Sequence, residues 1–324
     1  MHTLEDLQHR ISLVFSSLQI IGTPEELYKP IDYTLSIGGK RLRPLMVLSG
    51  CDLFEGDIEN ALPAAIGIEF LHNFTLLHDD IMDQAPLRRG YETVYKKWDT
   101  NHAILSGDTL FALACKKLSE LQPDILPDAL KLFTRTVIEI CEGQQWDMNF
   151  ESRDDVTIPE YLEMIRLKTA VLLACSLKMG ALIAHADPDD ADALYEYGIN
   201  IGMAFQLQDD FLDVFGEKKV FGKEIGGDIV CNKKTFLLLK AFNKAGDSDY
   251  QELIHWFTEE FPDPAVKIKG VKDIYIRLGI REDTLHEMEK YYSSALKCLH
   301  SVRVLEQNKK EILSLSNQIL HRDH

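Results

Sequence analysis

Two stretches of this sequence carry the same pattern of aspartates, His78-Asp79-Asp80-Ile81-Met82-Asp83 and Gln208-Asp209-Asp210-Phe211-Leu212-Asp213. Each follows an apolar run and places carboxylates at positions i, i+1 and i+4. On an α-helix the i and i+4 side chains share one face, so these like charges repel one another unless a cation binds there. A site built only from oxygen atoms suits Mg²⁺, which takes its remaining ligands from water and phosphate. A solvated acidic face is the alternative, and two copies in matching apolar contexts disfavour it.

Composition restricts the classes of function. The 324 residues are 45% hydrophobic, which is enough for a large folded core, and the formal net charge is −17. This charge argues against a nucleic acid or an anionic membrane surface as partner. Six scattered cysteines without a CxxC pair indicate reduced thiols. We find no signal peptide and no apolar run of about 18 residues, so we expect a cytoplasmic protein without a membrane anchor.

Apolar residues recur at helical spacing along most of the chain. The Gly22-Thr23-Pro24 segment predicts a helix start, with Thr23 as the N-cap and Pro24 in the first helical position. We find no convincing alternating strand and no linker. The sequence therefore predicts one all-α domain over residues 1–324, whose principal helices are Leu4 to Leu18, Glu25 to Ile37, Pro44 to Leu53, Asn60 to Asp83, Ala103 to Leu121, Asp190 to Phe215, Leu285 to Val304 and Glu311 to Leu320.

Basic residues gather in short stretches despite the acidic composition. The segment Gly38-Gly39-Lys40-Arg41-Leu42-Arg43-Pro44 has three cations behind two glycines, a plausible phosphate-binding turn. In all, seven cations lie in separate stretches: Lys40, Arg43, Arg88, Arg89, Lys168, Lys223 and Lys233. One diphosphate needs fewer, so two anions are indicated. With apolar helix interiors for a hydrocarbon, the sequence predicts metal-assisted departure of a phosphate leaving group from an apolar substrate.

Several motifs in order resemble the trans-polyprenyl diphosphate synthase family. They are the Gly38–Pro44 segment, Asp79–Asp83 followed by Arg88-Arg89-Gly90, Lys168-Thr169, and Phe205–Asp213. The resemblance implies a single-domain prenyl synthase bundle of helices around a central cavity, a homodimer, and three Mg²⁺ ions per active site. It implies a prenyltransferase that condenses isopentenyl diphosphate head-to-tail (1′-4) with dimethylallyl, geranyl or farnesyl diphosphate, giving a short all-trans product.

The resemblance also implies residue roles. Asp79, Asp83 and Asp209 are the expected Mg²⁺ ligands, supported through water or from behind by Asp80, Asp210 and Asp213. Isopentenyl diphosphate is expected to bind Lys40, Arg43, His72 and Arg89. The allylic diphosphate is expected to bind Arg88, Lys168, Lys223 and Lys233. Lys168, Thr169 and Gln206 are the expected catalytic residues, the last two presenting oxygen atoms to the allylic cation. Gln144 and Asp147 match a weaker family motif near the allylic pocket.

Product length is expected to depend on the helix before Asp79. Phe74, five residues before it, is bulky, and Thr75, four before it, is small. The first acidic motif has no two-residue insertion. Within the family this combination favours geranylgeranyl diphosphate (C20), with farnesyl diphosphate (C15) as the near rival. The alternative is that Phe74 is ordinary helix packing.

Three other functions are alternatives for this sequence. A terpene cyclase shares the fold and the first motif, but its second motif normally mixes Asn or Asp with Ser or Thr and Glu. A His-Asp metal phosphohydrolase can be read into His78-Asp79 but leaves the second motif and the basic segment unexplained. A non-catalytic diphosphate-binding subunit of a two-component synthase usually loses acidic motifs, and this chain keeps both.

Overall fold

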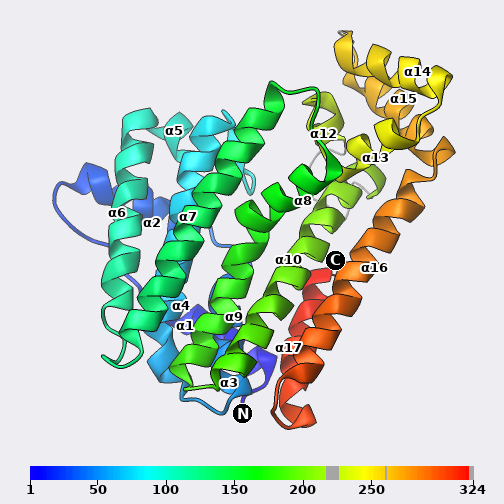
Figure 1. The fold of residues 1–324 in the computed structure, drawn as a ribbon. Coiled ribbons are helices and arrows are strands. Elements are labelled where there is room, and N and C mark those ends of the chain that lie inside the picture. Colours follow the sequence, from blue (N-terminus) through cyan, green and yellow to red (C-terminus); the bar gives the residue numbers. More distant parts are fainter. Residues whose placement is uncertain (217–225, 260, 321–324) are drawn as a thin grey trace. The chain divides into compact units, whose positions relative to one another are not determined.

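The computed structural model describes residues 1–216, 226–259 and 261–320. Almost all regular structure in these ranges is helical, which confirms the all-α prediction (Figure 1). No helix in the described ranges is both long and apolar enough to cross a lipid bilayer. The helices are α1 (Leu4–Ser17), α2 (Glu25–Ser36), α3 (Leu42–Leu53), α4 (Ile58–Met82), α5 (Val94–Lys97), α6 (Thr100–Leu118), α7 (Leu126–Glu151), α8 (Ile158–Ile165), α9 (Val171–Ile183), α10 (Pro188–Phe215), α12 (Gly227–Val230), α13 (Phe236–Lys244), α14 (Asp247–Thr258), α15 (Pro264–Arg277), α16 (Ile280–Ser301) and α17 (Glu306–Leu320).

Local capping explains where the first helices begin. Thr3 and Asp6 form a capping box at the start of α1, each side chain bonding to the other's backbone N–H. The predicted N-cap role of Thr23 is wrong. Pro24 is the residue that precedes α2; its backbone is extended, with ψ of 144°, and it makes no side-chain capping bond. The fixed φ of proline suits this position as well as the first helical one, so the helix starts one residue later, at Glu25.

The chain forms two compact units. Unit 1 comprises Met1–Phe133, Ser176–Ala191 and Val304–Ile312, and unit 2 comprises Thr134–Cys175, Asp192–Arg303 and Leu313–His324. The prediction of one domain over residues 1–324 stays a prediction.

Helix α4 is the core of unit 1. It contacts α3 and α6, and most of its length is buried on every side, including Ala61, Ala64, Ile68 and Leu71. Small side chains such as these alanines let neighbouring helices approach closely. A helix that is apolar all round belongs in a protein interior. Burial of α4 therefore fixes the position of its C-terminal end, where the first acidic motif lies.

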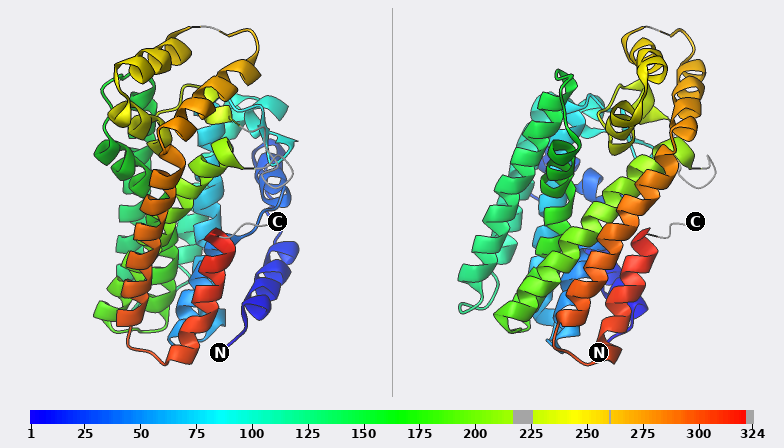
Figure 2. Two further views of the ribbon diagram at one scale, coloured as in Figure 1. Left: turned by 90° about the vertical axis from the view of Figure 1, so that its right-hand side faces the viewer. Right: turned by 45° about the vertical axis from the view of Figure 1, so that its right-hand side comes forward.

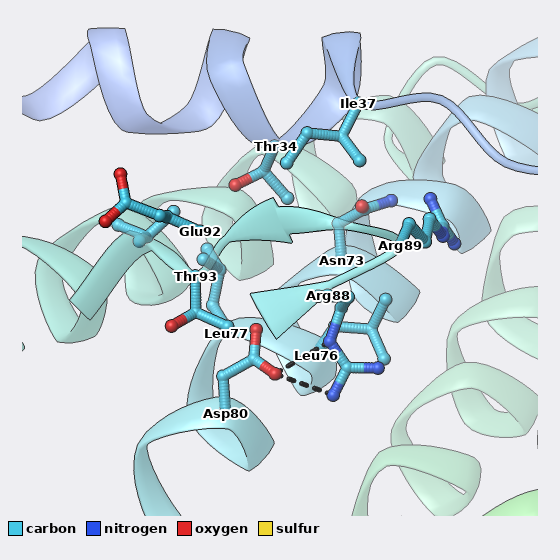
Figure 3. A pocket seen from close by; sticks show the side chains of 11 residues that line it. Thr34, Ile37, Asn73, Leu76, Leu77, Asp80, Arg88, Arg89, Glu92 and Thr93 are labelled. Carbon is cyan, nitrogen blue, oxygen red and sulfur yellow. Dashed lines mark hydrogen bonds and ion pairs between the residues drawn. The ribbon is translucent and has the colours of Figure 1, made fainter. Parts of the chain in front are cut away.

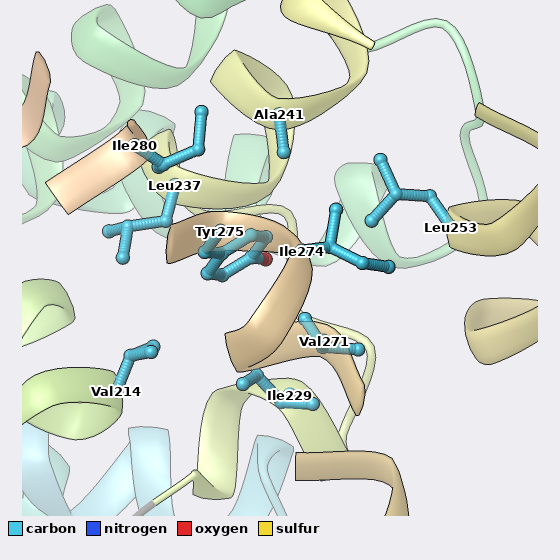
Figure 4. Packing of buried hydrophobic residues seen from close by; sticks show 9 residues of the cluster. All are labelled: Val214, Ile229, Leu237, Ala241, Leu253, Val271, Ile274, Tyr275 and Ile280. Atoms are coloured by element: carbon cyan, nitrogen blue, oxygen red, sulfur yellow. The ribbon is translucent and has the colours of Figure 1, made fainter. Parts of the chain in front are cut away.

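Unit 2 has an apolar cluster at the end of α10 (Figure 4). Its buried members are Val214, Ile229, Leu237, Ala241, Leu253, Val271, Ile274, Tyr275 and Ile280. They come from α10, the short helix α12 and helices α13 to α16. Figures 1 and 2 show α14 and α15, in yellow and orange, beside each other in this part of the unit, and they are in contact. Because Val214 and Ile229 share the cluster, it holds α12 against the second acidic motif on α10.

Two short segments depart from regular α-helix. Residues Leu87–Arg88 (β1) and Tyr91–Glu92 (β2) form an antiparallel hairpin, with Arg88 opposite Tyr91. The sequence analysis found no strand, because two residues are too few to show alternation. The second departure is a π-helical turn over Arg166–Ala170, between α8 and α9. Such turns are frequently found at functional sites.

Candidate active site

The first acidic motif lies at the C-terminal end of α4, in unit 1. Asp80 is buried, whereas Asp83, the last residue of the motif, is exposed and follows the helix. Arg88 reaches the motif: its Nε lies 2.7 Å from Oδ1 of Asp80, and its Nη2 lies 3.2 Å from Oδ2 of Asp79. Burial raises the pKa of Asp80, and the charge of Arg88 opposes this rise. The motif is thus a set of carboxylates, two of which contact the same arginine.

Adjacent arginines of the hairpin have different neighbours. Arg88 contacts Asp80, as the dashed lines in Figure 3 show. Arg89 lies against Gly39, where an added Cβ would come within 2.5 Å of Nη1 of Arg89. A side chain at position 39 would displace this guanidinium. Residues of α2, α4 and the hairpin line a cavity of about 20 Å³, which has room for about one water molecule (Figure 3).

The basic segment turns sharply before α3. Gly38, Gly39 and Arg41 have φ values of 79°, 138° and 44°, a region that favours glycine. Helix α3 begins at Leu42, so the prediction that Pro44 starts it is wrong by two residues. Pro44 lies in the first turn, where its missing N–H leaves no helical bond unmade. The turn at Arg41 therefore separates Lys40, which precedes it, from Arg43, which lies in the first turn of α3.

The predicted isopentenyl diphosphate ligands gather in unit 1. Nη1 of Arg43 lies 3.1 Å from Nε2 of His72. Because a guanidinium only donates, Nε2 of His72 accepts, and the ring is neutral. Burial and then the charges of Arg43 and other arginines hold the pKa of His72 well below its usual value. Burial lowers the pKa of Arg43 to about 10, and Arg89 adds to the effect. Lys40 is exposed, next to Gly39. Together these residues form the basic cluster, a positive region suited to a polyanion: Lys40, Arg43, His72 and Arg89.

Sequence analysis missed two residues of this region, Arg41 and Glu69. Glu69 is 2% exposed on α4 and forms an ion pair with Arg41. Nδ2 of Asn73 donates to Oε1 of Glu69 over 3.1 Å. Arg41 reads as a surface cation and Glu69 as one more acidic residue, so only the packing of α4 reveals the pair.

Phe74 stands in a column of rings in unit 1. Its centroid lies 4.7 Å from that of His78 and 5.5 Å from that of Phe111, which in turn stacks on Phe133 at 6.2 Å. Edge-to-face and offset pairs of this kind are favourable. Oγ1 of Thr75 donates to the carbonyl of His72 over 2.8 Å. Phe74 is therefore supported from two sides.

The second acidic motif lies on α10 in unit 2 and is held by side chains of three segments. Oγ1 of Thr169 donates to Oε1 of Gln206 over 3.0 Å, and Nε2 of Gln206 donates to Oδ1 of Asp210 over 3.2 Å. The hydroxyl of Tyr161 donates to Oδ2 of Asp210. Both oxygens of Asp210 thus have protein partners. Tyr161 escaped sequence analysis because a tyrosine on an apolar helix face reads as core.

Burial makes this motif reluctant to ionise. Asp210 and Asp213 are 2% and 8% exposed. Burial, followed by the charge of Asp228, raises the pKa of Asp210 and raises that of Asp213 to about 6. The backbone N–H of Asp228 donates to Oδ2 of Asp213 over 3.1 Å. A divalent cation would relieve this crowding of carboxylates.

Two adjacent lysines of unit 2, Lys233 and Lys234, have different neighbours. The charge of Lys233 opposes the raised pKa of both Asp210 and Asp213, so it lies near the motif. Nζ of Lys234 lies 3.9 Å from Asp154. The structure thus places Lys233 near the second acidic motif, and its role as a ligand of the allylic diphosphate stays a prediction. Lys223 lies outside the described residues.

The π turn presents Lys168 and Thr169. The N–H of Val171 bonds to the carbonyl of Arg166, five residues back. Nζ of Lys168 lies 2.6 Å from Oδ2 of Asp147 on α7. Gly143, one turn before Asp147, permits this, because an added Cβ would lie 2.4 Å from the backbone nitrogen of Lys168. Gln144 is half-buried beside Gly143. The weaker motif at Gly143 to Asp147 therefore seats the turn that carries Lys168.

The predicted site residues thus form one group in each unit. Asp79, Asp80 and Asp83 with the basic cluster lie in unit 1, and Asp209, Asp210, Asp213, Lys168, Thr169, Gln206 and Lys233 lie in unit 2. Within the described ranges, no three His, Cys, Asp or Glu side chains form a ready-made metal site. The donors of both motifs are nevertheless carboxylate oxygens, and a cation would oppose the raised pKa values of Asp80, Asp210 and Asp213. Such a donor set fits Mg²⁺.

A helical fold whose long core helices carry paired aspartates defines the class of isoprenoid synthases. Comparison with known proteins agrees: a sequence model of the family described as polyprenyl synthetase matches residues 24–274. The chain belongs to this family. It is a prenyltransferase that makes short-chain prenyl diphosphates, and enzymes of the family generally depend on a divalent metal.

Individual relatives are consistent with this. Geranylgeranyl diphosphate synthase of Methanosarcina mazei is 42% identical over 249 residues, covering 75% of this chain and 77% of that one. A crystal structure of geranylgeranyl pyrophosphate synthase, 44% identical, covers 100% of both chains with a TM-score of 0.94. Geranylgeranyl pyrophosphate synthase of Corynebacterium glutamicum, solved with isoprenyl diphosphate and magnesium, is 27% identical and covers 98% of this chain and 96% of its own, with a TM-score of 0.83.

Proposed function

We propose that this chain condenses isopentenyl diphosphate with allylic diphosphates to give geranylgeranyl diphosphate, using Mg²⁺. The observation that carries the proposal is the divergence of Arg88 and Arg89. Arg88 contacts the aspartates, and Arg89 lies against the Gly38–Arg43 segment. One hairpin thus serves two anion sites, as a reaction between two diphosphates requires. A cyclase handles one diphosphate and has no use for the second site.

The aspartates of both motifs are the proposed metal ligands. Asp79, Asp83 and Asp209 would bind the ions, and Asp80, Asp210 and Asp213 would hold the site together from behind. Bound divalent ions would supply neutralising charge for the departing diphosphate. The protein's own cations, Arg88, Lys168, Lys223 and Lys233, would bind the oxygens of the allylic diphosphate and fix its orientation.

The remaining residues would act on the substrates in turn. Cleavage of the allylic C1–O bond leaves a cation, to which the oxygens of Thr169 and Gln206 offer partial negative charge. Arg43, Arg89, Lys40 and neutral His72 hold isopentenyl diphosphate so that its double bond forms the new 1′-4 bond. Loss of a proton from C2 of the isopentenyl unit completes the step, and the released diphosphate is the base.

Phe74 is the proposed limit on product length. Its support by His78 and Phe111 explains how a single ring can resist a growing chain. We expect Phe74→Ala to shift the product from C20 toward C25 or longer, and Thr75→Phe to shorten it toward C15. Thr75→Ser, which keeps the hydroxyl and a small side chain, is the control. If Phe74→Ala leaves the lengths unchanged, Phe74 is ordinary packing.

The experiment that tests the function is product analysis. Purified protein with Mg²⁺ and isopentenyl diphosphate is incubated separately with the C5, C10 and C15 allylic diphosphates, and the dephosphorylated alcohols are separated by length. A Mg²⁺-dependent C20 alcohol is the expected result. A C15 product would keep the chemistry and overturn the length. A cyclic hydrocarbon formed without isopentenyl diphosphate would indicate a cyclase, and binding without turnover would indicate the non-catalytic subunit.

We also propose that the chain works as a homodimer, on its membership of the family. Light scattering at working concentration tests this. A mass near twice 37.0 kDa is expected, and a mass equal to one chain would contradict it.

A further inference from the structure

Arg41 is a cation of the basic segment to which the mechanism above assigns no task. Its side chain is 13% exposed and is turned into unit 1. Three elements hold its guanidinium: Glu69 of α4 accepts from Nη1, the carbonyl of Leu35 in α2 accepts from Nη2, and the ring of Phe15 in α1 lies 4.6 Å away. Because both Nη1 and Nη2 donate to partners inside the protein, Arg41 is poorly placed to bind a ligand itself.

The backbone of Arg41 is also unusual. Its φ of 44° lies in the left-handed region, which residues with a Cβ rarely adopt. Such a conformation persists only when the surrounding contacts determine it. Here the three contacts of the side chain provide that constraint. The turn that separates Lys40 from Arg43 is therefore fixed by the side chain between them.

Glu69 creates a second requirement. It is 2% exposed and lies close enough to Arg43 and Arg89 for its charge to oppose the burial that lowers the pKa of both. A buried carboxylate needs charged or hydrogen-bonding partners. If Arg41 were absent, Glu69 would keep only Asn73 and would draw Arg43 and Arg89 toward itself. It would then compete with a bound diphosphate for these cations.

We propose that Arg41 is a positioning residue for isopentenyl diphosphate. It fixes the turn that presents Lys40 and Arg43, and by pairing with Glu69 it leaves Arg43 and Arg89 available to the substrate. This inference rests on the proposed function, in which these residues bind isopentenyl diphosphate. Both effects of removing Arg41 weaken that binding, so the sign of the outcome is determined.

The test is steady-state kinetics of Arg41→Met, which removes the charge and keeps an apolar stem. We expect the KM for isopentenyl diphosphate to rise about 10- to 100-fold, the change that loss of one charge-assisted contact produces. The KM for the allylic substrate and the kcat at saturation stay within about threefold of the original. Arg41→Met with Glu69→Gln recovers part of the loss, because the competing charge is gone. Arg10→Met, which breaks an exposed pair with Glu59, is the matched control.

Some outcomes would overturn the inference. An unchanged KM for isopentenyl diphosphate in Arg41→Met would do so, as would an equal rise for both substrates. Where Arg41→Met does not fold by circular dichroism, Arg41→Lys replaces it: it keeps the charge but not the paired donors, and we expect a smaller rise in the same KM. If Arg43→Gln raises this KM and neither Arg41 variant does, the proposed function stands and the inference fails. If the unaltered protein consumes no isopentenyl diphosphate, the proposed function itself fails.

Discussion

Unit 1 contains the basic cluster, and unit 2 contains a carboxylate cluster formed by Asp209, Asp210 and Asp213. Ionisable groups of the two clusters have pKa values shifted in opposite directions. In unit 1, burial beside arginines lowers the pKa of His72 and of Arg43. In unit 2, burial beside Asp228 raises the pKa of Asp210 and of Asp213. Burial alone penalises charge of either sign. What distinguishes the clusters is the sign of the charge that each has collected.

The difference indicates what each cluster is prepared to bind. A buried group of cations stabilises an anion without waiting for rearrangement, and a buried group of carboxylates does the same for a metal ion. An enzyme that joins two diphosphates with metal assistance needs both. The first acidic motif lies between these extremes, since Asp79 and Asp80 already have Arg88 as a partner. The predictions below test this division, in order of expected size.

The largest effect is expected in the carboxylate cluster. Asp209→Asn removes one proposed metal ligand and should lower kcat by about 10²- to 10³-fold, the cost of losing one group that stabilises developing charge. The Mg²⁺ concentration for half-maximal rate should rise. Asp192→Asn, an exposed position on the same helix, is the control. A loss confined to the KM for isopentenyl diphosphate would break the comparison, since that signature belongs to unit 1.

The basic cluster should show the complementary pattern. Arg43→Gln removes a charge-assisted contact, worth about 1.5–3 kcal/mol, so the KM for isopentenyl diphosphate should rise at least about tenfold. The Mg²⁺ dependence should stay unchanged. Kinetics with each substrate and the metal varied in turn separates the two patterns. A changed Mg²⁺ requirement would mean that the clusters do not divide the work.

A smaller effect is expected for Tyr161→Phe. The variant removes the hydroxyl that donates to Asp210 and leaves one carboxylate oxygen without this partner. We expect kcat to fall about 3- to 10-fold, as for loss of one hydrogen bond. Tyr197→Phe, which removes another buried hydroxyl of unit 2, should lower thermal stability only. Equal kinetic effects in both variants would show that Tyr161 acts through folding alone.

Very little of the hydrogen bonding around Asp210 could be predicted from the sequence. Helical periodicity predicted the helices, and the spacing of the aspartates predicted each acidic motif, because both depend on neighbours within one or two turns. The grouping of residues far apart in the chain, such as Arg43 with His72, came only from the resemblance to a known family. Tyr161 and Asp228 act over long separations, and a tyrosine among apolar residues gives no signal for its hydroxyl. Likewise, Arg41 and Lys40 are adjacent cations, and only tertiary packing turns one of them inward. Thr23 has the right residue type for a cap, and Pro24 overrode it locally.

The smallest effects are expected in the pH dependence of the unfolding free energy, to which His72 and Asp213 should contribute with opposite signs. The depressed pKa of His72 means that the unfolded chain binds more protons below its usual value of 6.5. Its contribution to unfolding free energy is therefore present above this pH and lost on acidification, by at most about 1.4 kcal/mol per pH unit. Asp213, with its pKa raised to about 6 from 3.8, binds more protons when folded, so its contribution falls as pH rises through that window.

Two variants measure these slopes. Denaturant unfolding between pH 4 and 7, without metal, gives the slope of the unfolding free energy against pH. This slope should be less positive for His72→Gln and more positive for Asp213→Asn. The unaltered protein is the reference for both. Slopes that shift in the same direction would contradict the opposite polarity of the two clusters.

The π turn at Arg166–Ala170 has a consequence for sequence change. It holds one residue more than an α-turn, so it takes up that residue without changing the direction in which α9 faces. Deleting one residue there would restore regular α-helical hydrogen bonding and keep α9 close to its present orientation. The deletion would instead remove the widened turn that presents Lys168 and Thr169. The extra residue therefore serves the position of these two side chains more than the packing of α9.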